Sequence, residues 1–285
     1  MVLSTQDLQA LCQLAIKAAT MAGTLISQRT NEKLIVQNKS GGTSLASQVF
    51  TEVDIASEQL IIETLNPSLK QYDLALLSEE TPDDRQRFEK DYFWCIDPLD
   101  GTLPFIEQQN GYSVSIALVA KDGTPVIGVI FDPKTSNLYY AIKDKGAYKN
   151  NSPWMIENEN NCLTLVCDRS FFKHAKYGEV ISKLKHIFKE ELQVIKHGGA
   201  AMNAIWVIEN HPAIYMKFPK QEDGGGSLWD YAATTCIYNE LGASATDFWG
   251  KDLMLNSNAS TFMNKKGIYY CSSIALYNKT KALFT

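Results

Sequence analysis

The first long segment of the chain places apolar residues at the spacing of a helix. Ser4 or Thr5 can cap its start, and Asp7 lies in the first turn, where a carboxylate interacts favourably with the helix dipole. The apolar residues that share one face are Leu8, Leu11, Cys12, Ala15, Ala19, Ala22 and Ile26. This spacing predicts an amphipathic helix that packs on a core.

A polar segment rich in Gly and Ser follows at residues 37–47, and we expect it to form a loop. The next apolar positions predict a second helix over residues 53–65. We expect this helix to end before Asn66-Pro67, because the residue before a proline disfavours the helical backbone conformation.

The middle of the chain has the pattern of β-strands. Short apolar runs predict two strands at residues 74–77 and 93–96, and the second run leads directly into a polar turn. Further runs predict strands at residues 114–120, 126–131 and 138–142. Turn dipeptides at Asp122-Gly123 and Asp132-Pro133 separate these three strands, so we expect them to form an antiparallel meander.

Residues 149–161 are polar, rich in Asn and contain Pro153, which makes them the best candidate for a domain boundary. We therefore divide the chain into an N-terminal half, 1–155, and a C-terminal half, 156–285. The second half is predicted to hold strands at 163–167, 192–196 and 213–218 and helices at 177–188, 201–209 and 228–241, the last capped by Ser227. Helices mixed with parallel and antiparallel strands indicate a layered α/β fold.

The composition of the chain narrows the range of possible partners and cellular locations. The chain has 285 residues, is 45% hydrophobic and 21% charged, and has a formal net charge of −5, which gives no basic excess for binding a nucleic acid polymer. Its six cysteines have no C-x-x-C spacing, so we expect reduced, buried thiols in a cytoplasmic protein. The first residues do not have the pattern of a signal peptide, and we expect no membrane insertion.

The segment from Asp97 to Thr102, Asp-Pro-Leu-Asp-Gly-Thr, carries the strongest chemical signal. Two carboxylates, Asp97 and Asp100, follow an apolar run on a turn stiffened by Pro98, and hard divalent cations prefer such oxygen ligands. If a helix begins at Gly101 or Thr102, its N–H groups form a phosphate seat beside the metal. The alternative is an ordinary turn, because Asp-Pro and Asp-Gly are common turn dipeptides.

Five acidic residues lie at the ends of apolar segments or beside a Gly-rich loop, where layered α/β folds build sites. They are Asp54, Glu79, Asp97, Asp100 and Asp230. Carboxylates that cluster cannot all stay ionised without cations, and Mg²⁺ is the natural counter-ion when phosphate is present.

These residues carry a resemblance. Residues 97–102 resemble the D-P-[IL]-D-G-T motif of the inositol monophosphatase superfamily, a group of magnesium-dependent, lithium-sensitive phosphatases. Its other elements follow the same order: Ser78-Glu79-Glu80 resembles G-E-E, residues 50–54 resemble V-T-x-x-D, and residues 228–233 resemble W-D-x-A-A. The four matches span about residues 50–242.

The resemblance implies an αβαβα sandwich of two α/β halves, with the site between them. It implies two or three Mg²⁺ ions, held by Glu79, Asp97, the Leu99 carbonyl, Asp100 and Asp230, with Asp54 assisting a weaker third ion through water. Gly101 and Thr102 N–H groups would seat the phosphate, and Thr102 and Glu79 would orient and deprotonate the attacking water. Lithium would replace one of the magnesium ions.

The subfamily is less clear. Phe105-Ile106, residues 110–118 and residues 260–264 resemble bacterial 3′(2′),5′-bisphosphate nucleotidases, whereas Leu103 and residues 199–203 depart from their pattern. We expect hydrolysis of the 3′-phosphate of adenosine 3′,5′-bisphosphate, with inositol monophosphate or another sugar phosphate, such as fructose 1,6-bisphosphate, as the alternative. A pseudoenzyme that binds metal and phosphate is the non-catalytic alternative.

For several residues near the predicted site, the sequence allows both a structural role and a role in binding substrate. His197, Gly198 and Gly199 are candidates for binding substrate, although a lone histidine is more often structural. Lys196, His197 and Lys217 are the candidate cations for a second phosphate of the substrate. Lys39 is equally well interpreted as a solvated lysine in a loop and as a residue that helps to place the phosphate or metal-bound water. The expected partner is a small phosphorylated molecule, and a homodimer stays open.

Overall fold

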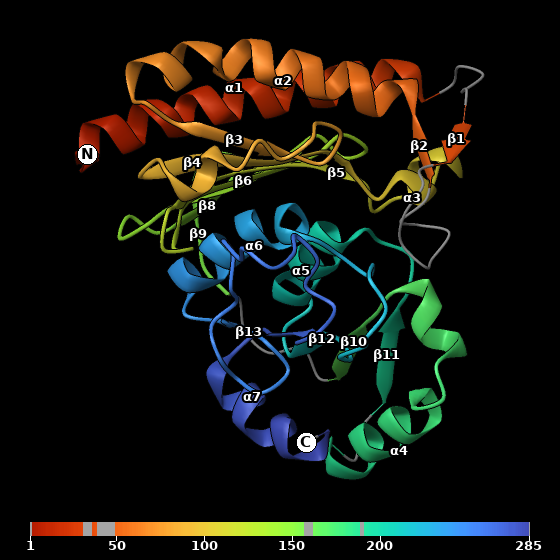
Figure 1. The fold of residues 1–285 in the computed structure, drawn as a ribbon. Helices are drawn as coiled ribbons and strands as arrows, with labels where there is room; N and C mark the ends of the chain where they lie inside the picture. The colour runs from red at the N-terminus through yellow and green to blue at the C-terminus, as the bar shows by residue number, and fades with distance from the viewer. Residues whose placement is uncertain (1, 31–35, 39–48, 157–161, 189–190, 285) are drawn as a thin grey trace.

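The computed structural model describes residues 2–30, 36–38, 49–156, 162–188 and 191–284. It has five layers, α–β–α–β–α, as expected (Figure 1). Two long helices, α1 (Thr5–Arg29) and α2 (Glu52–Gln71), cover the outer face of a large sheet. The central layer is α5 (Ala200–Glu209) with α6 (Leu228–Leu241), and beyond the second sheet lie α4 (Tyr177–Phe188) and α7 (Ile274–Thr280).

The larger sheet has seven strands in the order β3-β4-β5-β6-β7-β8-β9. These are β3 (Ala75–Ser78), β4 (Tyr92–Asp100), β5 (Ser113–Ala120), β6 (Pro125–Asp132), β7 (Asn137–Ile142), β8 (Ala147–Lys149) and β9 (Ser152–Trp154). β3 and β4 are parallel and every later pair is antiparallel, which confirms the meander. The hairpin of β8 and β9 extends the sheet beyond the strands that the sequence predicted.

The smaller sheet has five strands in the order β11-β10-β12-β14-β13. These are β10 (Leu163–Val166), β11 (Leu192–Ile195), β12 (Ala213–Lys217), β13 (Ser244–Thr246) and β14 (Ile268–Cys271). β10 runs parallel to β11 and β12, whereas β14 is antiparallel to both of its neighbours. The remaining elements are the pair β1 (Val36–Asn38) and β2 (Val49–Thr51), the short helix α3 (Thr102–Ile106), and 3₁₀ turns at Gln86–Phe88, Arg169–Lys173 and Lys281–Leu283.

Helix α1 begins as predicted, because Ser4 and Asp7 form a reciprocal capping box. Helix α1 is long and apolar enough to cross a membrane by length and composition alone. Its small apolar residues nevertheless pack against α2 and the large sheet, as in a core helix. Those with no exposed surface are Cys12, Ala15, Ala18, Ala19, Ala22 and Ile26.

Helix α2 continues through Pro67 to Gln71, so the predicted stop before Asn66-Pro67 is wrong. A proline inside a helix removes one backbone hydrogen bond. Other contacts offset this loss: within the helix the buried Ser68 hydroxyl donates to the Leu65 carbonyl over 2.6 Å, and from the sheet it accepts from Trp94 Nε1 over 3.0 Å. These contacts hold the last turn of the helix against the sheet.

One continuous core fills the space between the two sheets and includes most of α5 and α6. Between β9 and β10 the chain passes from the large sheet to the small one. The division at residue 155 stays a prediction, because side chains from both halves share this core. All six cysteines are unpaired, and only Cys162 is not fully buried.

Candidate active site

A cavity of about 1010 Å³ lies where the end of β4, helix α3 and the first turns of α5 and α6 meet. Apart from the three candidate lysines, the sequence singled out eleven residues, and the cavity brings together ten of them from segments more than 150 positions apart. They are Glu79, Asp97, Leu99, Asp100, Gly101, Thr102, His197, Gly198, Gly199 and Asp230. The eleventh, Asp54, lies directly behind Thr102. Lys39 lies outside the described residues.

Three carboxylates form the centre of the cavity. Asp97, Asp100 and Asp230 each offer an oxygen, and these oxygens lie within 4.8 Å of one another. The end of β4 brings the first two together, because its pairing with β5 shifts register between Asp97 and Asp100. The Leu99 N–H donates to Asp97 Oδ1 over 3.0 Å and holds that carboxylate on the turn.

The electrostatics of this cluster favour a cation. Burial, together with the charges of Glu79, Asp100 and Asp230, raises the pKa of Asp97 well above its usual value. Burial also raises the pKa of Asp100 to about 6, and burial with the Asp100 charge raises that of Asp230 to about 8. An all-oxygen set of carboxylates that repel one another fits a hard divalent cation such as Mg²⁺.

Asp100 links the end of β4 to the start of α5. Its two oxygens accept hydrogen bonds from the Ala200 N–H over 2.9 Å and the Ala201 N–H over 2.8 Å. A helix N-terminus stabilises a carboxylate in this position. Gly199 makes the approach possible, since a Cβ there would lie 2.5 Å from Asp100 Oδ2.

Asp230 occupies the first turn of α6, where Ser227 and Asp230 form a capping box. The Ser227 N–H donates to Asp230 Oδ2, so one carboxylate oxygen stabilises the helix start. The same side chain belongs to the acidic cluster, which explains why the W-D motif lies at a helix N-terminus.

Thr102 is the first residue of α3, after Gly101 in the left-handed region at φ 86°. Its hydroxyl donates to Asp54 Oδ1 over 3.2 Å. Asp54 Oδ2 accepts from the Thr51 N–H and the Thr51 hydroxyl, each over 2.7 Å, at the start of α2. Asp54 therefore fixes the Thr102 hydroxyl at the cavity edge and caps a helix at the same time.

Glu79 follows β3 and lines the cavity beside Asp97. Glu58 holds this segment in place, because its carboxylate accepts from the Glu80 N–H over 3.1 Å and from the Thr81 hydroxyl over 3.0 Å. Glu58 was not among the residues predicted for the site. Its spacing of four residues from Asp54 on one helix was the available signal, since such residues share a helix face.

The profile of the inositol monophosphatase family matches residues 7–281. This chain belongs to the inositol monophosphatase family. Among curated proteins, Nus factor SuhB of Pasteurella multocida is 29% identical over 246 residues, which cover 86% of this chain and 87% of that protein. Nus factor SuhB of Escherichia coli K12 is 29% identical over 248 residues, covering 86% and 88%.

Solved structures share the family fold. The inositol monophosphatase of Anabaena superposes with a TM-score of 0.70 at 24% identity, covering 97% of this chain and 96% of that one. The IMPase of Thermotoga maritima gives a TM-score of 0.74 at 21% identity, covering 95% of each chain. SaIMPase-II has been solved bound to inositol monophosphate and bound to 2′AMP, with TM-scores of 0.70 and 0.72 at 22% identity and 96% coverage of this chain. The two superpositions cover 93% and 94% of the SaIMPase-II chains.

The same cavity is lined by a half-buried lysine, Lys217. Lys217 Nζ lies 3.0 Å from Asp168 Oδ2 and donates to the Gly225 carbonyl over 2.9 Å. Burial opposes the charge on Lys217, but Asp168, the neighbouring tyrosines and Asp230 together outweigh it and raise the lysine pKa well above its usual value. The Lys217 charge in turn lowers the pKa values of Asp100 and Asp230.

Asp168, which the sequence analysis did not single out, organises this side of the cavity. Besides Lys217, its carboxylate accepts from the Tyr215 hydroxyl over 2.9 Å and from Asn203 Nδ2 over 3.1 Å. Asn203 belongs to the segment that departs from the nucleotidase pattern, and its amide also donates to the Gly198 carbonyl over 3.1 Å. The departing segment thus supplies polar contacts on this side of the cavity.

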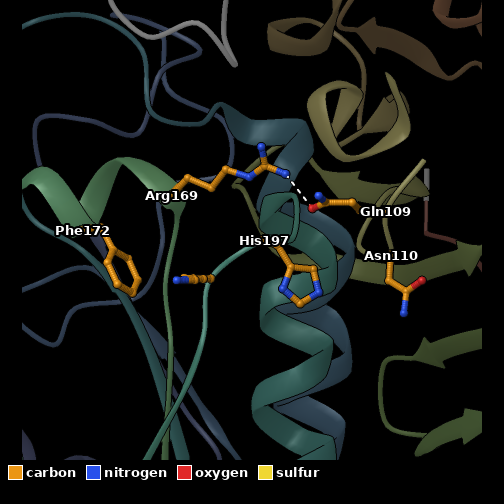
Figure 2. Close-up of a pocket in the computed structure, with 6 residues that line it drawn as sticks. Gln109, Asn110, Arg169, Phe172 and His197 are labelled. Atoms are coloured by element: carbon orange, nitrogen blue, oxygen red, sulfur yellow. Dashed lines mark hydrogen bonds between the residues drawn. The ribbon is translucent and has the colours of Figure 1, made fainter. Parts of the chain in front are cut away.

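His197 precedes the Gly198-Gly199 turn and packs its ring on Trp206, with ring centroids 4.9 Å apart. Burial and the nearby Arg169 charge lower the pKa of His197, so the ring is neutral at pH 7. This histidine lines the main cavity and a second, smaller one (Figure 2). The structure therefore combines the packing role and the pocket position that the sequence left as alternatives.

Proposed function

We propose that this protein is a magnesium-dependent phosphomonoesterase that removes the 3′-phosphate of adenosine 3′,5′-bisphosphate. The observation that carries the proposal is the buried cluster of Asp97, Asp100 and Asp230 beside Thr102 at the start of α3. The coarser statement, a phosphatase of the inositol monophosphatase family, rests on the family match. The expected substrate is a small molecule rather than a nucleic acid polymer, in agreement with the net charge of −5.

The proposed ligands of two or three Mg²⁺ ions are carboxylates and one carbonyl. They are Glu79, Asp97, Asp100, Asp230 and the Leu99 carbonyl oxygen, and all five residues line the main cavity. When bound, Mg²⁺ neutralises charge on the phosphate and lowers the pKa of water. The repulsion among Asp97, Asp100 and Asp230 supports this assignment, because it leaves the cluster unstable as three anions.

The chain's own groups would position the reacting phosphate and water. The N–H groups of Gly101 and Thr102 lie at the start of α3, where backbone donors have no partner within the helix and suit a phosphate oxygen. Thr102 donates its hydroxyl proton to Asp54, so its oxygen lone pairs point away from Asp54 and accept a hydrogen bond from the attacking water. Glu79 is the proposed general base for that water.

The walls of the cavity support a nucleotide as the leaving group. Phe171, His174 and Phe218 line one side, and the His174 and Phe218 rings are stacked with centroids 5.4 Å apart. Aromatic side chains of this kind suit a nucleobase. SaIMPase-II, which shares the fold, has been solved with inositol monophosphate and with 2′AMP, so inositol monophosphate is the alternative substrate.

A phosphate-release assay in magnesium tests the proposal. The panel contains adenosine 3′,5′-bisphosphate, inositol monophosphate and fructose 1,6-bisphosphate, and kcat/KM is compared at equal magnesium. We expect the nucleotide to be preferred. A tenfold preference for inositol monophosphate would overturn the substrate assignment and leave the phosphatase class intact.

The alternative is a protein that binds metal and phosphate without turnover. It is worth testing because the curated relatives carry the name Nus factor SuhB, which specifies no substrate. No phosphate release from any member of the panel, together with Mg²⁺ binding by calorimetry, would favour this alternative. We further propose a cytoplasmic location, which the six unpaired thiols support.

A further inference from the structure

A second cavity, of about 650 Å³, lies beside the main one and is open to solvent. Six residues line it: Gln109, Asn110, Arg169, Phe172, Lys196 and His197. Figure 2 shows Gln109 and Asn110 on one side, His197 in the middle and Arg169 and Phe172 on the other. The lining contains two cationic side chains, two amides and one imidazole, and no carboxylate.

Lys196 supplies the charge that is free to bind a ligand. Its ammonium lies 4.3 Å from the centroid of the Phe172 ring, and it forms no ion pair with the acidic residues that the structure describes. Phe172 is one of the few large aromatic side chains with an exposed ring. A cation over an exposed ring keeps its outer N–H groups directed to solvent, where they can meet an anion.

Arg169 is held in place rather than free. Its Nη1 donates to Glu107 Oε1 over 2.7 Å, and its Nη2 donates to Gln109 Oε1 over 2.9 Å (Figure 2). This pairing neutralises Glu107 at the rim and fixes the guanidinium between the two cavities. The cavity therefore retains a positive balance, which comes from Lys196.

The two cavities are adjacent, because Arg169 and His197 line both. Only Gly198 and Gly199 separate His197 from Ala200, whose N–H binds Asp100. At about 3.5 Å per residue, His197 and Ala200 lie no more than about 11 Å apart along the backbone. A molecule that places one phosphate at the acidic cluster can therefore place another part of itself in the second cavity.

We propose that the second cavity binds a second phosphate of the substrate, held by Lys196 and by the side-chain N–H groups of His197 and the two amides. The protein would thus select small substrates that carry two phosphates. This inference rests on the proposed phosphatase function. In the main cavity Lys217 does not serve this purpose, because its ammonium is already committed to Asp168 and to the Gly225 carbonyl.

The test compares two substrates that differ only in the distal group. Adenosine 3′,5′-bisphosphate and adenosine 3′-monophosphate share the scissile phosphate, and only the first carries a 5′-phosphate. We expect Lys196→Gln to lower kcat/KM about tenfold for the bisphosphate, as for a lost charge-assisted hydrogen bond, and to leave the monophosphate within about twofold. Lys279→Gln is the matched control, because Lys279 also lies over a ring, that of Phe188, but outside both cavities.

An equal loss for both substrates would overturn the proposal and indicate a general effect of charge or a site for a free anion. No loss for the bisphosphate would overturn it as well. Both results leave the phosphatase function standing, provided that the wild-type protein releases phosphate.

A binding experiment separates failure of the subsite from failure of the proposed function. Adenosine 5′-monophosphate carries only the distal phosphate, and its binding is measured by calorimetry in EDTA, without turnover. We expect binding to the wild-type protein and to Lys279→Gln, and at least about fivefold weaker binding to Lys196→Gln. If the wild-type protein hydrolyses nothing in the panel, this titration still decides the subsite. Undetectable binding, or equal binding by all three proteins, would overturn it.

Discussion

The Thr102 hydroxyl donates to Asp54 Oδ1 over 3.2 Å, and the other oxygen of that carboxylate caps helix α2. One side chain thus sets the position of a proposed reacting group and the start of a structural helix. The two contacts use different oxygens of Asp54, so a substitution at Thr102 removes the contact at the cavity and leaves the helix cap in place.

Thr102→Ala should lower kcat about 100-fold or more and change KM little, because the hydroxyl acts on the attacking water in the transition state. Thr102→Ser keeps the hydroxyl and should stay within about tenfold of wild type. Asp54→Asn should also lower kcat. The double variant Thr102→Ala/Asp54→Asn should raise the activation free energy by less than the sum of the two single changes. A change in KM alone would show that Thr102 only holds substrate.

Metal dependence is tested at Asp97, whose carboxylate belongs to the acidic cluster and is buried beside the charges of Glu79, Asp100 and Asp230. Asp97→Asn should lower activity by at least about 100-fold through weakened metal binding. EDTA should abolish activity, and added Mg²⁺ should restore it in the wild-type protein. Wild-type turnover by Asp97→Asn would contradict the proposed metal site.

Mg²⁺ should also stabilise the fold, because it relieves repulsion among the carboxylates that β4 and α6 bring together. A ligand at 100 times its Kd stabilises the native state by about 2.7 kcal/mol. We expect a higher Tm in saturating Mg²⁺ than in EDTA, and no such difference at equal ionic strength with K⁺. The metal site is refuted if Mg²⁺ and EDTA give the same Tm in calorimetry.

Gly199→Ala tests the contact between α5 and the acidic cluster. A Cβ at Gly199 would lie 2.5 Å from Asp100 Oδ2, so the carboxylate has to move. We expect a loss of stability of about 1–3 kcal/mol and a fall in activity of at least about tenfold. The control is Gly178→Ala in α4, where a Cβ meets nothing within 4 Å and a better helix former should leave both properties intact or improve stability. Equal behaviour of the two variants would show that the Gly199 contact is unimportant.

Lithium sensitivity is the prediction that depends on family resemblance. Lithium at tens of millimolar should inhibit phosphate release, with potassium at the same concentration as the control. Insensitivity would indicate a metal site that diverges from the resemblance.

Helices and strands could be predicted from the sequence where the signals that set their bounds lie within the segment itself. The bounds of α4 and α6 agree with the predicted helices, because the apolar spacing and, for α6, the Ser227 cap lie within or next to the segment itself. The end of α2 was missed, since the contact of Ser68 with Trp94 comes from the sheet and outweighs the local effect of Pro67. Glu58 and Asp168 were missed for the same reason: their roles depend on partners more than twenty residues away.

The positions of the cysteines make the chain suitable for following its own unfolding. Burial raises the pKa of Cys12 to about 12 and that of Cys271 to about 12, so these thiols form almost no thiolate at neutral pH. Cys162 is the one cysteine with partial exposure. A brief pulse of an alkylating reagent should therefore add one label to each native chain and six to each unfolded chain, so that mass spectrometry counts the two populations directly.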